Sequence, residues 1–267
     1  MIRKYIIVFV TIICLLTFLN GCIEDNKPSV VTDFTYEPLY PKAKEKIFFN
    51  STSHTLNREI INWSWDFGDG NISFGENVTH QYYNVDTYDV RLTITDDVAT
   101  HFKERKITAG INASLNDLSI SISDLNDTYT PQGEEYISDP YVVPSGELLE
   151  GRTVVEKYLI GFVLQDKVII QQLGRLQSIA DTEEYLNLIK PFYSSMGYNL
   201  LSTEKYGDES YAAVFEEEDE VNYVISFRIK DLVIAIETVN EPLDLITDLA
   251  SILEEKILKS ISNDYEV

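Results

Sequence analysis

Carboxylates are the side chains of this sequence most able to do chemistry. The chain has 44 Asp and Glu residues, and two carboxylates at a fixed separation are enough for glycoside hydrolysis. The densest acidic run, Glu216 to Glu220, falls where we expect a hairpin tip, so we interpret it as a solvated loop. Because no pair stands out among so many acids, we predict no catalytic residue.

Asp66 and Asp69 lie at a glycine turn, Gly68-Asp69-Gly70. Carboxylate oxygens gathered by a tight turn suit a hard cation such as Ca²⁺, which makes both residues candidate metal ligands. The alternative is that they cap the turn through hydrogen bonds to backbone N–H groups. We favour capping, because the loop lacks the spaced Asp/Asn series of a dedicated calcium loop.

Residues 112–267 contain no histidine and no cysteine. This excludes Ser-His-Asp and Cys-His nucleophile systems and zinc sites of ordinary ligand type from that part of the chain. The three histidines, His54, His80 and His101, show no metal spacing, and we interpret His80 as structural. No glycine-rich phosphate loop or dinucleotide motif is present, so we predict no cofactor.

The formal charge of −23 at pH 7 restricts the partners of the chain. An acidic surface repels phosphate backbones and anionic head groups. We therefore predict no nucleic-acid binding and some attraction for cations or basic partners. Acidity also keeps an exposed protein in solution, which is the simpler interpretation.

Residues 1–22 have the order of a secretory signal, with a basic start and an apolar run from Tyr5 to Leu19. Leu19-Asn20-Gly21-Cys22 resembles the lipobox of prokaryotic lipoproteins, which implies lipidation of Cys22 after cleavage. The alternative is an uncleaved signal anchor, because the apolar run approaches the ~17–25 residues that span a bilayer. Both interpretations place the chain on the external face of the cell membrane, with residues 23–29 as a tether.

Sequons for N-glycosylation support an external location if the source organism glycosylates asparagine. All of them precede residue 127. The six acceptors are Asn50, Asn62, Asn71, Asn77, Asn112 and Asn126.

Residues 30–110 have the pattern of an all-β sandwich, in which short alternating strands are separated by Pro, Asn, Asp and Gly turns. The alternation predicts that one face of each strand is buried. The clearest runs are Ile61, Trp63, Trp65 and Phe67, and then Val90, Leu92 and Ile94.

Two motifs in this region resemble those of PKD domains. The resemblance implies an immunoglobulin-like sandwich that serves as a spacer or as a module binding protein or carbohydrate. Asp86 departs from the pattern, because the family usually has Gly two residues before Tyr88, and this puts the shape of that turn in question. The matching residues are Trp63, Trp65, Asp66, Phe67, Gly68, Asp69 and Gly70, followed by His80, Tyr82 and Tyr88.

The pattern of residues 111–267 predicts an α+β domain, in which helices cover one face of an antiparallel sheet. Leu115 to Leu125 alternates, and a polar loop is expected from there to Pro140. The expected strands are 158–164 and 168–173 as a hairpin, then 210–215, 222–229 and 232–237 as a meander.

Helical spacing marks two further segments. Asp181 to Met196 places Tyr185, Leu188, Ile189 and Phe192 on one side, with Asp181 as N-cap and Gly197 as the stop. Pro242 to Ile261 is an amphipathic helix. Tyr206-Gly207-Asp208-Glu209-Ser210-Tyr211 and the order of elements resemble exported lipoprotein domains of the PsbP/LpqN type.

The sequence thus favours a non-enzymatic surface lipoprotein of a prokaryote, archaeal by resemblance, whose first domain presents a C-terminal binding domain. Its partners would be the membrane, through the N-terminus, and a surface protein or carbohydrate. An extracellular hydrolase with an accessory PKD module is an alternative, as is a structural envelope component that assembles through a sandwich edge.

Overall fold

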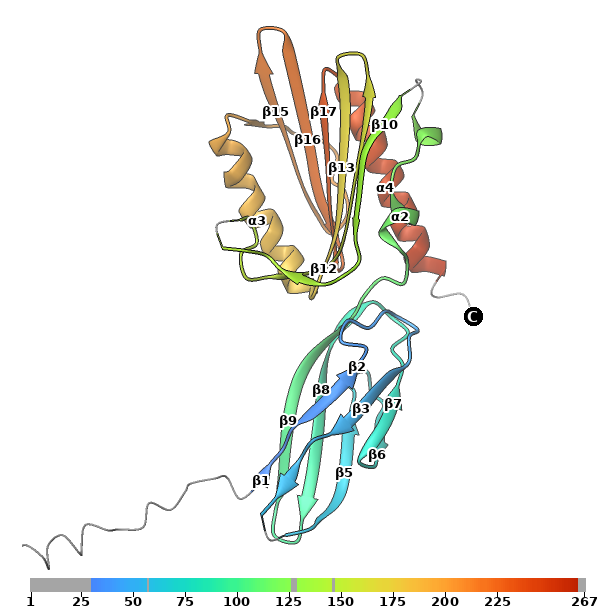
Figure 1. Ribbon diagram of the computed structural model, residues 1–267, viewed down its shortest axis with the longest axis vertical. Helices are drawn as coiled ribbons and strands as arrows, with labels where there is room; N and C mark the ends of the chain where they lie inside the picture. Colours follow the sequence, from blue (N-terminus) through green and yellow to red (C-terminus); the bar gives the residue numbers. More distant parts are fainter. Residues whose placement is uncertain (1–29, 57, 126–128, 146, 264–267) are drawn as a thin grey trace, which may run out of the picture.

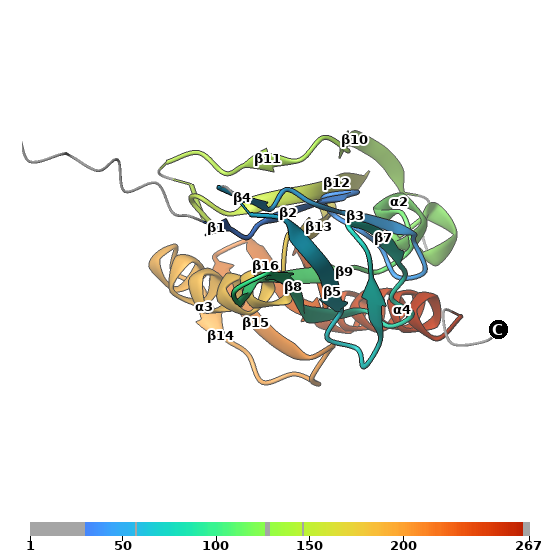
Figure 2. The same cartoon turned by 90° about the horizontal axis from the view of Figure 1, so that it is seen from below.

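The computed structural model describes residues 30–56, 58–125, 129–145 and 147–263. Two lobes follow one another along the long axis: the N-terminal sandwich, residues 30–110, below, and the C-terminal domain, residues 111–263, above (Figure 1). Figure 2 looks along that axis from the sandwich end. Residues 1–29, with the predicted signal, Cys22 and tether, lie outside the described residues. Among the residues that the structure describes, no helix is both long and apolar enough to cross a membrane.

The sandwich has a three-stranded sheet, β2-β3-β7, facing a four-stranded sheet, β6-β5-β8-β9, with a small β1-β4 pair beside them. All paired strands are antiparallel, as the alternating pattern predicts. The strands are β1 Val30–Val31, β2 Phe34–Glu37, β3 Ile47–Ser51, β4 His54–Thr55, β5 Ile60–Asp66, β6 Ile72–Phe74, β7 Asn77–His80, β8 Asp86–Asp96 and β9 Thr100–Ala109.

Aromatic and branched side chains fill the space between the two sheets. Trp65 is fully buried and meets Phe34 edge to face, with ring centroids 5.2 Å apart. Val90, Leu92 and Ile94 of β8 are also fully buried, which confirms the alternation predicted for that strand.

The expected alternation is wrong at the start of β5. A register shift between Ile60 and Asn62 inserts a bulge, so Ile61 is 63% exposed while Ile60 packs against the core. A bulge adds one residue to one strand and so reverses the face of every residue before it. The period of two therefore holds only from Trp63 onward.

The C-terminal domain is mostly sheet, in the order β10-β12-β13-β17-β16-β15-β14, with β11 paired to β12. The predicted hairpin, the three-strand meander and the final helix are all confirmed. Its elements are α2 Leu115–Leu118, η1 Ile122–Asp124, β10 Thr130–Ile137, β11 Tyr141–Val142, β12 Thr153–Leu164, β13 Lys167–Leu176, α3 Ile179–Ser195, β14 Asn199–Leu200, β15 Glu209–Glu217, β16 Glu220–Ile229, β17 Leu232–Val239 and α4 Leu243–Asn263.

Helices cover both faces of this sheet, not one as predicted. Helix α3 packs on Tyr211, Ala213 and Val224, whereas α4 packs on the side chains of Ala212 and Ile225. Successive residues of a strand point to opposite faces, so the two helices lie on opposite sides of the sheet (Figure 1).

Two segments before β12 differ from the predictions. Leu115 to Leu125 is not a strand: Ser114 caps α2 by accepting a hydrogen bond from the Asp117 N–H at 3.3 Å. The expected polar loop contains β10, an edge strand that pairs with β12 on the side away from β13. Almost all residues of β10 are exposed. A strand that is polar on both faces has no alternation by which it can be recognised.

Helix α3 begins earlier than expected. Ser178 is the N-cap, because its Oγ accepts a hydrogen bond from the Asp181 N–H at 3.2 Å. The buried side chains of α3 include Leu186, Ile189 and Tyr193, whereas Phe192 is 45% exposed. The stop at Gly197, which has φ of 91°, is confirmed.

Candidate functional site

The candidate metal ligands Asp66 and Asp69 cap their turn. Asp66 Oδ1 accepts a hydrogen bond from the Gly68 N–H, and Asp69 Oδ1 accepts one from the Asn71 N–H, both at 3.0 Å. The second oxygen of Asp69 lies 2.8 Å from Nε2 of His80. No group of three metal-ligating side chains occurs within the described ranges. These bonds match the capping interpretation.

The aromatic residues of the same motif build the end of the sandwich. The ring of His80 stacks on Phe67 with centroids 4.0 Å apart, and Tyr82 donates a 2.8 Å hydrogen bond to the Phe67 carbonyl. Tyr88 stacks on Tyr82 at 3.8 Å and donates to the Asn84 carbonyl. Burial raises the pKa of Tyr82 above its usual value. These side chains are committed to the fold.

The departure from the motif at Asp86 causes no strain. Asp86 is the first residue of β8, paired with Ala109, and its carboxylate accepts a 2.8 Å hydrogen bond from the Thr87 N–H. It is not among the residues with positive φ, so the glycine usual at this point is not required here.

The sequon asparagines that the structure describes are all exposed: Asn50, Asn62, Asn71, Asn77 and Asn112. The Asn71 side chain donates a 3.1 Å hydrogen bond to Asp69. Asn126 lies outside the described residues. Glycosylation at any of these positions stays a prediction.

A buried ionic network, which the sequence did not reveal, lies in the C-terminal domain at its junction with the sandwich. Arg175 at the end of β13 binds Asp231 through Nη1 at 2.7 Å and Glu156 through Nε at 3.0 Å. Asp231 also accepts the N–H of Ile111, the first residue after the sandwich, at 3.1 Å. All three charged side chains are less than a tenth exposed. The network therefore fixes the chain where it leaves the sandwich.

Neighbouring groups of this network favour the charged forms of Arg175 and Glu156. Burial lowers the pKa of Arg175, but the carboxylates of Asp231 and Glu156 outweigh it and raise that pKa overall. Burial likewise raises the pKa of Glu156, and the hydrogen bond from Tyr136 with the charge of Arg175 lowers it overall. Removing one partner would leave a buried charge unpaired.

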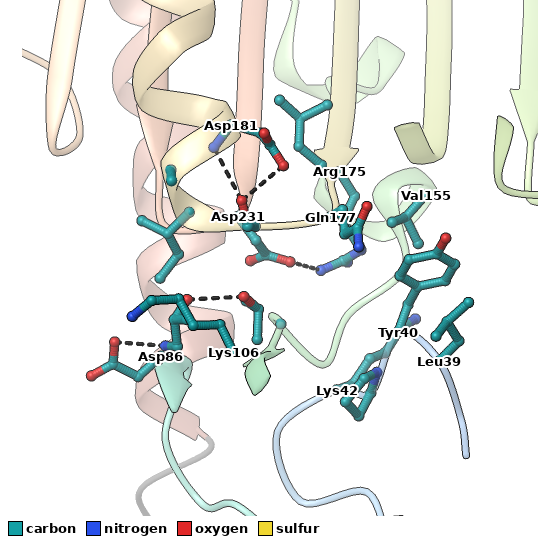
Figure 3. Close-up of a pocket in the computed structure, with 18 of the residues that line it drawn as sticks. Leu39, Tyr40, Lys42, Asp86, Lys106, Val155, Arg175, Gln177, Asp181 and Asp231 are labelled. Atoms are coloured by element: carbon teal, nitrogen blue, oxygen red, sulfur yellow. Dashed lines mark hydrogen bonds and ion pairs between the residues drawn. The ribbon is translucent and has the colours of Figure 1, made fainter. Parts of the chain in front are cut away.

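A cavity of about 560 Å³ with a mixed polar and apolar lining lies beside the network, between the domains. Figure 3 shows Tyr40 and Lys42 approaching from the sandwich, with Arg175 and Asp231 opposite them. Apolar contact continues past the cavity, because Ala43 and Val85 of the sandwich belong to the same buried cluster as Ile111 and Leu115. The domains therefore share part of a core.

A second cavity, of about 480 Å³, lies in the C-terminal domain between α3 and the sheet, and we call it the α3-face pocket. Small residues, Gly174 and Ala235, form its floor. Val143, Leu148 and Leu149, from the segment between β11 and β12, form one wall. Four aromatic side chains also line the pocket, namely Tyr185, Phe192, Tyr193 and Tyr198.

Glu237 of β17 is the principal polar group of the α3-face pocket. The Tyr193 hydroxyl donates a hydrogen bond to its Oε1. Burial first, and then the charge of Glu237, raise the pKa of Tyr185, Tyr193 and Tyr198. These three tyrosines are therefore neutral at physiological pH and surround a carboxylate.

The pocket also holds Glu147, which is exposed, and Lys157. Lys157 Nζ lies 3.9 Å from Glu135 Oε2. Sequence reasoning missed Glu237 as a site residue, because a single acid in an apolar strand does not stand out among 44. The available signal was the run Val233-Ala235-Glu237 on one face of a strand, where a small residue leaves space beside a charge.

Comparison with known proteins matches the first domain. A family model described as PKD domain matches residues 34–109. Collagenase ColA of Bacillus cereus is 30% identical over 114 residues, 42% of this chain and 10% of that protein. Microbial collagenase of Vibrio alginolyticus is 41% identical over 66 residues, 22% of this chain and 8% of that protein. The chain thus spans a tenth or less of the length of these curated relatives.

Among solved structures, the PKD1 domain of Vibrio anguillarum Epp is 26% identical in sequence. The match covers 31% of this chain and 94% of that domain, with a TM-score of 0.28.

Proposed function

Given that residues 34–109 form a PKD domain, we propose that this chain is a non-enzymatic cell-surface lipoprotein whose PKD domain presents a C-terminal ligand-binding domain. The two collagenases that this chain matches share only a tenth or less of their length with it. An accessory role for the PKD domain, beside a second functional unit, fits such a partial match. The second unit in this chain is the domain that follows Gly110.

The observation that carries the proposal is the α3-face pocket. Its volume of about 480 Å³ lies within the ~300–1,000 Å³ of small-molecule sites. Its lining is mainly aliphatic and aromatic with a few polar groups, which is the composition of such sites. A pocket of this kind supports binding of a small molecule by the C-terminal domain.

The buried network around Arg175 supports the presenting role. It holds the first residue after the sandwich against β13 and the turn before β17. Ala43 and Val85 of the sandwich pack in the same buried cluster as Ile111, so rotation of the two domains about Gly110 would be restricted. The PKD domain would then hold the pocket at a set distance from the anchor. A flexible linker would not do this.

The N-terminal sequence supports anchoring at the membrane. Lipidation of Cys22 would anchor the chain on the external face of the membrane, and an uncleaved signal anchor is the alternative. We further propose an archaeal origin, glycans on the sequons and a C-terminal domain of the PsbP/LpqN type.

Anchoring and ligand binding are tested on the same protein. Intact mass and detergent partitioning of the chain from native membranes are compared with Cys22→Ser, which we expect to lose both a diacylglyceryl-sized mass and membrane retention. The full chain is then screened against a diverse metabolite library by thermal shift, beside Ala235→Phe, which fills the pocket floor. Hits that both forms bind equally, or no hits at all, would contradict the binding role, provided that circular dichroism shows the variant to be folded.

A hydrolase is the second candidate, because Glu147 and Glu237 line one pocket with aromatic side chains. Two carboxylates around a sugar ring are sufficient for glycosidase chemistry. Hydrolysis of a fluorogenic glycoside that both Glu147→Gln and Glu237→Gln abolish would establish this function in place of the first.

A further inference from the structure

Resting on the proposed binding role of the α3-face pocket, we propose that its ligand is a small organic ammonium ion, with Glu237 as the counter-charge and tyrosine rings around the cation. The carboxylate of Glu237, the tyrosine rings and the other ionised groups of the pocket each favour an ammonium ligand.

Glu237 is a partly buried carboxylate without a cation beside it. Within the part of the chain that the structure describes, no Lys, Arg or His nitrogen lies within ion-pair distance of its oxygens. Its hydrogen bond comes from Tyr193, a neutral donor that adds no positive charge. A partly buried charge is costly unless it is paired, so a cationic ligand would supply what this pocket lacks.

The aromatic side chains of the pocket suit an ammonium group. Tyr193 and Tyr198 meet edge to face with ring centroids 5.1 Å apart, and Tyr185 lines the same pocket. Ring faces carry negative potential and attract cations, and quaternary ammonium ligands are commonly recognised by such sets of rings. Neutral tyrosines keep this property without adding a formal charge of their own.

The other ionised groups do not favour an anion. Lys157 is the only cationic residue among those lining the pocket, and it faces Glu135. Glu147 adds a further negative charge at the wall. The chain carries a net charge of −23, so its long-range field draws cations toward the molecule.

Calorimetric titration of the full chain in a maltoside detergent, which has no ammonium group, tests the inference. The probes are choline and benzyltrimethylammonium, and 3,3-dimethylbutan-1-ol serves as the uncharged isostere of choline. We expect at least one cation to bind, and the neutral isostere to bind at least ~10-fold more weakly than choline. Glu237→Gln, which keeps an acceptor for Tyr193, should lose at least ~10-fold in affinity for the cation. Glu216→Gln, at the exposed hairpin tip, should lose none.

The outcomes separate the inference from the binding role. Equal binding of choline and its isostere, or unchanged affinity in Glu237→Gln, overturns the assignment of an ammonium ligand. If neither cation binds but a neutral or anionic compound binds and Ala235→Phe blocks it, the inference fails and the binding role stands. If no compound from the library binds, both fail.

Discussion

Removal of the Asp231 carboxylate should weaken the C-terminal domain more than any exposed substitution. In Asp231→Ala, Arg175 loses its 2.7 Å partner and the Ile111 N–H loses its acceptor. Breaking a buried ion pair by removing one partner costs about 3–5 kcal/mol. Arg175 keeps Glu156 and the Ala113 carbonyl, so we expect the lower end, about 3 kcal/mol of the free energy of unfolding.

Urea denaturation can follow the two domains separately. Both tryptophans, Trp63 and Trp65, lie in the PKD domain, so fluorescence reports that domain and circular dichroism reports both. With a slope of about 2 kcal/mol per molar urea, the C-terminal transition should shift by about 1.5 M. The fluorescence transition should move less, because the PKD core itself is untouched.

Two further variants identify the cause. Asp219→Asn, at the exposed tip between β15 and β16, removes a similar charge and should leave both transitions in place. Arg175→Met combined with Asp231→Ala should cost less than the sum of the single changes, because the first removes the ion that the second leaves unpaired. A decrease of less than about 1 kcal/mol in the free energy of unfolding of Asp231→Ala would refute the view that the network stabilises the C-terminal domain.

The remaining predictions concern the junction and the PKD domain. Gly110→Ala should destabilise the chain by about 1–3 kcal/mol in the same urea assay, because the new Cβ would collide with the fixed Asp231 carboxylate; an unchanged midpoint would contradict this. Tyr82→Phe should lower the stability seen by fluorescence by about 1–2 kcal/mol, since the buried Phe67 carbonyl loses its donor. Hydrogen bonds from the Ala99 and Val98 N–H groups lower the pKa of Asp96 to about 2. Because this folded-state pKa is depressed, Asp96 stabilises the fold above about pH 4, and the contribution is lost as the pH falls toward 2. Asp96→Asn should therefore flatten the decline of the fluorescence midpoint over that interval, and an equally steep decline would count against the assignment.

Sequence patterns predicted the elements in which one face is buried and the other is not. Val90, Leu92 and Ile94 alternate in β8, and Leu249, Leu253 and Ile257 repeat every four residues along α4, so each side chain's environment follows from its spacing. The same logic fails at β10, which is polar on both faces, and at Ile61, where one inserted residue reverses the faces.

The candidate site could not be predicted from spacing, because it depends on contacts between distant segments. Arg175, Asp231 and Glu156 are 19 or more residues apart and meet only after β12, β13 and the β16–β17 turn are paired. Glu237 likewise becomes part of a pocket only when α3 packs on the sheet face opposite α4 and Tyr193 reaches it. The one local signal, the small residue Ala235 beside Glu237 on the same strand face, does not by itself distinguish this acid from the others.

The length of β8 determines how strongly the charge of a nearby membrane would act on the C-terminal domain. Its 11 residues run along the long axis of the PKD domain (Figure 1) and span roughly 36 Å at about 3.3 Å per residue. The Debye length at physiological salt is about 8 Å. In the proposed anchored state, the acidic C-terminal domain would thus stand several screening lengths from anionic head groups, and lipid charge would have little influence on what enters its pocket.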